Sequence, residues 1–186
     1  EINVFEQTTL MIAANSSTEI FAELLKRGAN LHAIDMHGDA VLDHILEKPP
    51  INVEILALAL GAGANPNRET DDLTPLAKAT IHGDAEAVLI LLKAGANPNE
   101  RLRLDQKQVP MNFTSQAKEI VLNGGTPLML AAEFGHASVA KTLIEEGADP
   151  RFEVILGDKV LRAADIAKAQ RNDLLFSVIT GTRREK

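Results

Sequence analysis

A short closing signature recurs four times along the chain and constrains the fold more than any other feature of the sequence. Gly-Ala-Asn or Gly-Ala-Asp begins at Gly28, Gly63, Gly95 and Gly147, each time after an apolar stretch of helical character. A glycine just past a helix adopts the left-handed conformation that ends the helix without strain. The Asn, Asp and Pro residues that follow form turns and prevent the helix from continuing. We therefore expect a series of similar units.

Two of these units also share an opening signature. Thr74-Pro75-Leu76 and Thr126-Pro127-Leu128 are each followed by a glycine nine residues after the Thr and another twenty-one residues after it. Threonine caps a helix start, and proline is tolerated at the first helical position because its missing N–H would have no partner there. The first glycine, Gly83 or Gly135, turns the chain between two helices. The pattern thus predicts an antiparallel helix pair in each unit.

These motifs resemble the ankyrin repeat family, whose unit is a β-hairpin followed by two antiparallel helices. The copies from Gly124 to Asp149 and from Thr74 to Asn99 are the best preserved. The resemblance implies an all-α repeat solenoid, a stack of β-hairpin/helix-turn-helix units that forms a single domain over 1–186. Repeats are expected at about 1–35, 36–67, 68–99 and 124–152, with a C-terminal cap at 158–181.

The sequence lacks one residue that the family usually has. The histidine that normally follows Thr-Pro-Leu is replaced by Met11, Asp43, Ala77 and Met129. In the family this histidine ties adjacent repeats together. The resemblance therefore implies weaker coupling between the repeats of this chain, with the same fold.

An insertion interrupts the repeat between Asn99 and Gly124. The closing glycines are spaced 35, 32 and then 52 residues apart, so the last interval carries about nineteen residues beyond the usual period. Polar and apolar residues alternate over 101–105, and two β-branched residues stand near the end of the insert, both of which favour strands. We expect an extended hairpin finger over 100–123. The alternative is a short helix that begins at Thr114 or Ser115.

Charge and cysteine content exclude several classes of function. The chain has 26 acidic and 19 basic residues, and its net charge is −7. It is a poor candidate for binding nucleic acid or an anionic membrane surface, and a partner with basic patches is favoured. Without cysteine, it forms no disulfide or thiolate metal site, which favours a cytoplasmic location. No apolar run approaches the roughly 20 residues of a membrane span.

No motif predicts catalysis, a cofactor or a metal. The five histidines form no H-E-x-x-H pattern. Gly61-Ala62-Gly63 supplies half of a dinucleotide-binding motif, but it ends a helix instead of joining a strand to a helix. No serine lies in G-x-S-x-G. We therefore expect neither an enzyme nor a cofactor-binding protein.

Stacked repeats form a continuous concave face, which predicts a protein–protein interaction module. The candidate partner-binding residues are those that the pattern places outside the core at helix ends, together with residues in or beside the insert. They are Ile81, His82, Glu133, Phe134, Arg101, Arg103, Met111, Phe113 and Phe152. The four apolar residues near the insert either form an exposed patch or are covered because the insert folds back on Phe134. A stack with polar ends is expected to be a monomer.

Other interpretations remain open. The chain begins at Glu1 rather than at Met, so we expect it to be a processed or excised piece. It would then be the targeting arm of a larger enzyme or of a bacterial effector that acts in the host cytosol. A further hypothesis is an active site created by the insert. The resemblance also raises modification of Asn67 or Asn99 as a possibility.

Overall fold

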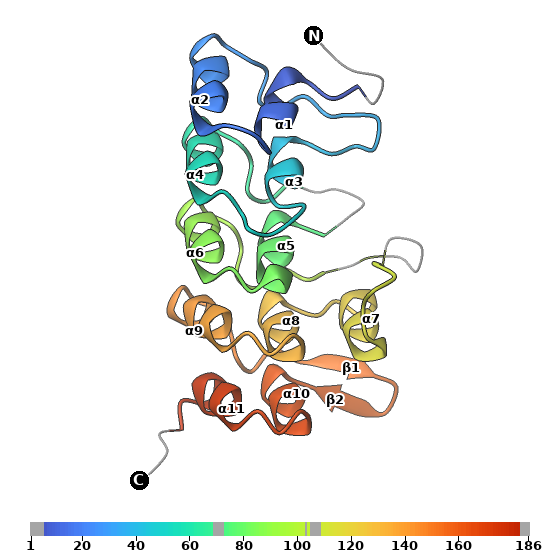
Figure 1. Cartoon of the computed structure of the whole chain (residues 1–186). Coiled ribbons are helices and arrows are strands. Elements are labelled where there is room, and N and C mark those ends of the chain that lie inside the picture. Colours follow the sequence, from blue (N-terminus) through green and yellow to red (C-terminus); the bar gives the residue numbers. More distant parts are fainter. Residues whose placement is uncertain (1–5, 69–72, 103, 105–108, 183–186) are drawn as a thin grey trace.

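The computed structural model describes residues 6–68, 73–102, 104 and 109–182 of the 186-residue chain. Within this part, helix pairs follow one another and build two columns (Figure 1). The first column contains the opening helices α1 (Thr9–Ala13), α3 (Val41–Ile45), α5 (Pro75–His82), α8 (Pro127–Glu133) and α10 (Ala163–Ala169). The second contains the closing helices α2 (Thr18–Lys26), α4 (Val53–Gly61), α6 (Ala85–Lys93), α9 (Ala137–Glu145) and α11 (Asp173–Thr180). The predicted all-α repeat solenoid is confirmed.

Successive pairs pack against each other along both columns. In the first column α1 contacts α3, α5 contacts α8 and α8 contacts α10, while in the second α2, α4, α6, α9 and α11 contact one another in turn. The leucine that follows the N-cap by two residues in the first four pairs is buried each time, at Leu10, Leu42, Leu76 and Leu128. The hydrophobic core therefore runs the length of the stack, and each pair buries its apolar side against its neighbours.

The predicted opening and closing signals start and end the helices with one exception. Thr74 accepts a hydrogen bond from the N–H of Ala77 at 3.3 Å, and Gly83 ends the helix with φ of 75°. Thr126 is also an N-cap residue, but its side chain makes no capping hydrogen bond. Its hydroxyl is buried and has no hydrogen-bond partner among the described residues. The capping role predicted for Thr126 is wrong for its side chain.

The two threonines should therefore respond to mutation with opposite signs. Thr74→Val removes a capping bond and should destabilise the fold by about 1 kcal/mol. Thr126→Val keeps the shape, removes a buried hydroxyl without a partner, and should stabilise the fold by about 1 kcal/mol. The free energy of unfolding in urea measures both. A loss of stability in both variants would mean that Thr126 has a partner in solution.

The connections between pairs are mostly turns and not strands. Of the described residues, only the segment after α9 forms strands, β1 (Val154–Leu156) and β2 (Lys159–Leu161), paired antiparallel with Ile155 opposite Val160. The other connections begin with side-chain turns; for example, the Asn65 side chain accepts from the N–H of Asn67 at 2.9 Å. Such turns give backbone N–H groups a side-chain partner nearby, and they take the place of the paired strands of the expected hairpins.

The hairpin finger predicted for 100–123 is wrong in its second arm, which belongs to helix α7 (Ser115–Leu122). Thr114 caps this helix by accepting from the N–H of Ala117 at 2.9 Å. Ala117 and Ile120 have no exposed surface, and α7 packs on α8. Burial at helical spacing thus outweighs the β-propensity of the segment. The first arm forms no strand where it is described, although the N–H of Leu102 donates to the carbonyl of Gly125 at 2.8 Å.

Candidate functional site

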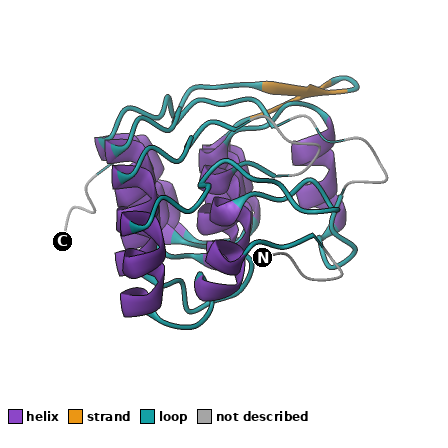
Figure 2. Cartoon of the chain, turned by 90° about the horizontal axis from the view of Figure 1, so that it is seen from above, coloured by secondary structure: helices purple, strands orange, loops and turns teal. Residues whose placement is uncertain are grey.

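The insert changes which part of the stack is accessible. We call the side of the first helix column that faces away from the second column the inner face. Helix α7 lies on this side of α8, as both views show (Figures 1 and 2). Ile120 and Val121 of α7 are fully buried, so the insert covers the inner face of the fourth pair. The main contacts of α7 are with α8, so α7 does not cover the inner face of the pairs before it.

A groove opens where this covered part begins. It has a volume of about 370 Å³ and lies between α3, α5 and the loop that leads into α7. We call it the insert groove. Its apolar lining includes Leu73, Ile81 and Phe113, and its polar lining includes Asp39, Glu47 and His82. The structure therefore brings three of the predicted site residues, Ile81, His82 and Phe113, to one place.

The aromatic residues of the insert do not form an exposed patch. The Phe113 ring packs edge-on against Phe134, with ring centroids 5.6 Å apart, and Phe113 is buried. Phe134 also stacks on His136 at 6.2 Å. The insert thus folds back on Phe134, which was the second of the two alternatives. Met111 alone among these predicted residues is almost fully exposed, at 95%.

Two further predicted residues tie the insert to the following repeat. The guanidinium of Arg101 lies 4.9 Å from the centre of the Phe152 ring, a distance at which cation and ring attract each other. Phe152 is half-buried and packs against the core. Arg103 lies outside the described residues. Arg101 and Phe152 are therefore engaged with each other within the chain.

Glu133 is likewise held by neighbours. Its carboxylate accepts a hydrogen bond from the Thr114 hydroxyl at 2.5 Å and another from the Gln170 amide at 3.2 Å. Gln170 also donates to the backbone carbonyl of Glu133 at 2.7 Å. Glu133 thus links the insert, the fourth pair and the last pair.

Two histidines tie neighbouring pairs together, His82 at the end of α5 and His136 at the N-cap of α9, and the sequence analysis missed both ties. His82 donates to the carbonyl of Leu46 at 3.1 Å, and His136 donates to the carbonyl of Ile81 at 2.9 Å. A Cβ at Gly83 would lie 2.7 Å from the His136 ring, so only glycine leaves room for this contact. Both bonds satisfy helix-end carbonyls that would otherwise lack a partner.

Asparagines make equivalent ties in the turns. Asn67 donates to the carbonyl of Gly95 at 2.7 Å and accepts from the N–H of Asn97 at 2.9 Å. Asn99 makes the same two bonds to the next pair, at 2.9 and 2.7 Å. Bonds between pairs therefore exist without the family's usual histidine, and the residues raised as modification candidates are structural links.

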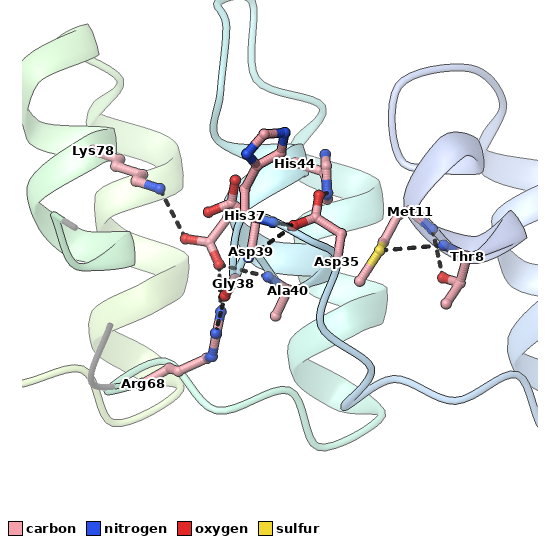
Figure 3. A network of polar contacts seen from close by, with 11 residues as sticks. Thr8, Met11, Asp35, His37, Gly38, Asp39, Ala40, His44, Arg68 and Lys78 are labelled. Carbon is pink, nitrogen blue, oxygen red and sulfur yellow. Dashed lines mark hydrogen bonds and ion pairs between the residues drawn. The ribbon is translucent and has the colours of Figure 1, made fainter. Parts of the chain in front are cut away.

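Figure 3 shows a network of charged groups around Asp43. Asp43 and Lys78 of this network also line the insert groove. The Asp43 carboxylate contacts the Arg68 guanidinium at 2.7 Å and the Lys78 ammonium at 2.8 Å. It also accepts from the N–H of Ala40 at 2.9 Å. Arg68 donates in addition to the carbonyl of Gly38. The sequence contained a signal for this network. Asp43 is a carboxylate at an otherwise apolar buried position, and such a group requires cationic partners.

A second buried carboxylate lies beside this network. Asp35 accepts from the N–H groups of His37 and Asp39, at 2.8 and 3.1 Å, and contacts His44 at 3.1 Å. Burial alone would raise its pKa, but these N–H groups and His44 outweigh burial and lower the pKa of Asp35. The pKa of Asp39 is raised, first by its own burial and then by Asp43 and Asp35, against the opposing charge of Lys78.

The lowered pKa of Asp35 predicts a loss of stability in acid. A carboxyl group with a lower pKa in the folded state stabilises the fold above its unfolded pKa, about 3.9, and this contribution disappears as the pH falls through the folded pKa. We expect Asp35→Asn to be less stable than wild type at pH 7 and to lose less stability between pH 5 and about pH 2. Urea titrations across this range measure the effect. Parallel curves for the two proteins would contradict the prediction.

The described residues show neither a metal-ligand cluster nor a membrane-spanning helix. They contain no group of three or more His, Cys, Asp and Glu side chains placed to hold a metal ion. None of the helices in the described part is both long enough and apolar enough to cross a bilayer. We take the insert groove as the candidate site, because three predicted site residues line it.

Comparisons with known proteins agree with this architecture. A family described as "Ankyrin repeats (3 copies)" matches residues 51–154, and "Ankyrin repeat" matches residues 5–36. Rabankyrin-5 of Mus musculus is 31% identical over 153 residues, which cover 80% of this chain and 13% of that protein. The nuclear factor NF-kappa-B p105 subunit of Gallus gallus is 26% identical over 172 residues, 81% of this chain and 17% of that protein. The aligned segment is less than a fifth of either relative.

A third relative also aligns with this chain over a small part of its own length. The ankyrin repeat and KH domain-containing protein mask-1 of Caenorhabditis elegans is 31% identical over 129 residues, 69% of this chain and 4% of that protein. Ankyrin repeats generally mediate protein–protein interaction and are generally non-catalytic. Repeat signatures, stacked helix pairs and family matches all agree, and the chain belongs to the ankyrin repeat family.

Proposed function

We propose that the chain is a non-catalytic interaction module that binds an extended segment of a partner protein on its inner face, with the insert groove as the anchor. The observation that carries this proposal is the groove itself, about 370 Å³ in volume, with walls from two repeats and the insert. Leu73 and Phe113 are buried in its lining, whereas Ile81 is only partly buried. A volume of this size accommodates one or two apolar side chains of a partner.

The polar lining favours a partner segment that also carries a basic side chain. Asp43 is neutralised by Lys78 and Arg68, and the other groove carboxylates are Asp39 and Glu47. Glu47 contacts the neighbouring Lys48 at 3.2 Å, but both side chains are exposed, so this weak pair is one that a partner cation would replace. The raised pKa of Asp39 also favours a basic partner, because a partner cation near Asp39 would stabilise its charged form. The net charge of −7 would also steer a basic partner toward the module.

The insert forms a wall of the groove at which a bound partner segment would end. Because α7 packs on α8 and Phe113 packs on Phe134, the C-terminal end of the loop that forms the groove wall is anchored. A partner segment that follows the inner face from the early repeats would end against this wall. A preformed site loses little conformational entropy on binding.

The test uses the captured partner and three variants of the chain. Affinity capture identifies the partner, and its dissociation constant is then measured for wild type, Ile81→Glu, Glu47→Lys and Leu89→Glu. We expect Ile81→Glu and Glu47→Lys to weaken binding at least about tenfold. Leu89→Glu is the matched control, since Leu89 is 38% exposed on α6 in the other column, and it should bind like wild type. Equal binding by Ile81→Glu and wild type, with equal melting temperatures, would refute the groove.

A second proposal keeps the same module but makes it the targeting arm of a larger protein. It is favoured by the short share of each relative that aligns, 13%, 17% and 4%. The arm would deliver a catalytic or effector domain to the partner bound in the groove. Its placement in the cytoplasm, including a host-cell cytosol, stays a prediction. Locating the chain in cells with a fluorescent tag, and reading the complete reading frame, would test both.

A further inference from the structure

Helix α4 is apolar on its exposed side as well as on its buried side. Its nine residues include a single charged one, Glu54. Ala57, Leu58 and Gly61 are exposed to solvent, and Leu58 has an exposure of 38%. A helix that is apolar all round is normally buried, so this side of α4 lacks the cover that its composition favours.

Nothing in the described structure requires a glycine at position 61. The turn after α4 is made by Gly63, whose φ is 100°, whereas Gly61 belongs to the helix. A Cβ at Gly61 would meet no described atom within 4 Å. The same position, nine residues after the N-cap, holds Lys26 in α2, Lys93 in α6, Glu145 in α9, and Gly181 just beyond the end of α11. A glycine in place of a charged side chain leaves a low surface that another backbone can approach closely.

A groove runs between α2 and α4 on this side, which faces away from the first column. We call it the outer groove. It has a volume of about 700 Å³, and its lining includes Ala22, Leu25, Lys26, Glu54, Ala57 and Leu58. The starts of the two helices meet, because the amide of Asn52 donates to the hydroxyl of Thr18 at 3.3 Å. The helices therefore run in the same direction, and no described helix or strand lies on their outer side (Figure 1).

The outer groove has one charged group of each sign, at opposite ends. Glu54 lies in the first turn of α4 and Lys26 in the last turn of α2, which separates them by roughly 10 Å along the helix axes. Neither side chain has an ion-pair partner among the described residues, whereas Lys93 pairs with Glu146 at 2.7 Å where α6 meets α9. The groove is thus complementary to a copy of itself that runs in the opposite direction.

We propose that the outer groove is the interface of a homodimer, in which a second copy of the chain packs its own α2 and α4 against it in the antiparallel sense. Such a two-fold contact repeats each interaction, so Glu54 of each copy meets Lys26 of the other, and Leu58 of each copy enters the other groove. Antiparallel packing also places the positive end of one helix dipole beside the negative end of another. A parallel arrangement would bring the two Glu54 carboxylates together and is disfavoured.

The dimer would be weak and would leave the insert groove open. The polar ends of the stack favour a monomer, but this surface lies along its side. Each copy presents two helices of nine residues, a small area beside the roughly 800 Å² that each partner buries in a standard interface. We therefore expect a dissociation constant of about 10 to 100 µM. The insert groove lies on the inner face, so the dimer does not depend on the function proposed above.

Sedimentation equilibrium tests the dimer, from well below to well above the expected dissociation constant. Interference detection is needed because the chain has no Trp and no Tyr. Leu58→Glu and Gly61→Lys should each weaken association at least about tenfold. Gly61→Lys should not lower the melting temperature, because lysine favours the last turn of a helix.

Leu174→Glu is the matched control, since Leu174 is 63% exposed on α11 at the other end of the same column. It should associate like wild type. A wild type that stays monomeric over the whole range overturns the proposal and leaves a helix of another protein as the occupant. Equal weakening by Leu58→Glu and Leu174→Glu overturns it too.

Charge reversal tests which surfaces meet. Glu54→Lys and Lys26→Glu should each weaken self-association about fivefold or more, because like charges then face each other at both ends of the interface. An equimolar mixture of the two variants should dimerise again, since each cation of one chain then faces a carboxylate of the other. Misfolding of either variant cannot produce this recovery. If the mixture does not associate, the two ends do not meet and the antiparallel homodimer is wrong.

Discussion

Replacing Asp43 with alanine is expected to lower the free energy of unfolding by about 3 kcal/mol, because two cations then lose their shared buried carboxylate. Asp43, in the second repeat, has a side-chain exposure of 4% and contacts Arg68 and Lys78 of the third repeat. Both cations are partly exposed, at 24% and 13%, so water compensates some of the loss and the effect lies at the lower end of the range for buried pairs. Urea denaturation at pH 7 measures it.

The last repeat contains a matched control for Asp43. Asp165 occupies the same position in α10 and accepts a hydrogen bond from the N–H of its own N-cap residue, Arg162, at 3.0 Å. Asp165→Ala therefore removes the same capping bond without removing a buried ion pair, and should cost only about 1 kcal/mol. An equal cost for both variants would show that the ion pairs of Asp43 contribute nothing.

A double variant separates the charge from the packing. Asp43→Leu together with Lys78→Leu replaces the more buried of the two ion pairs with apolar groups of similar volume, and should be more stable than Asp43→Ala. Arg68 remains partly hydrated and keeps its bond to Gly38. If the double variant is as unstable as the single one, the charged groups of the network stabilise the fold in a way that apolar groups of similar volume do not replace.

Phe113→Ala is expected to lower the free energy of unfolding of the insert by about 3 kcal/mol, since it removes a buried aromatic ring that packs against Phe134. The consequence for function follows from the same contact. Phe113 forms part of the groove wall, and its loss should also weaken partner binding at least about tenfold. Hydrogen exchange of the α7 amides and urea denaturation measure the first effect, and the dissociation constant measures the second.

Met111 provides the comparison two residues away. It is 95% exposed, so Met111→Ala should change stability by no more than about 0.5 kcal/mol. If Phe113→Ala is as mild as Met111→Ala in stability and exchange, the insert does not fold back on Phe134 in solution. If Met111→Ala alone reduces binding, the partner contacts the outer side of the insert and not the groove.

Much of the fold could be predicted because its signals act over a few residues. The cap at Thr74, the proline after it and the left-handed turn at Gly83 depend on neighbouring backbone groups, so they can be recognised in the sequence. The repeat spacing adds the stack, since a helix pair cannot bury its apolar side alone. The same local signal fails at Thr126, whose buried hydroxyl makes no capping hydrogen bond.

The insert shows where local signals are insufficient. Its second arm contains residues that prefer strands, yet it forms a helix because Ala117 and Ile120 find α8 to pack against. The predicted binding residues separate into two groups, because tertiary contacts decide where each side chain lies. Ile81, His82 and Phe113 meet in the groove, whereas Glu133, Arg101 and Phe152 contact other residues of the chain.

The sequence by itself determined the repeated helix pairs, their order and the absence of motifs for catalysis, because those properties depend on residue types at short, regular spacings. Only the tertiary structure decided which charged and aromatic residues meet. Asp43 and Lys78 are 35 residues apart in the chain, and no local rule relates them. Their contact, like that of Phe113 with Phe134, exists because stacking brings distant segments together, and the groove is formed by those same long-range contacts.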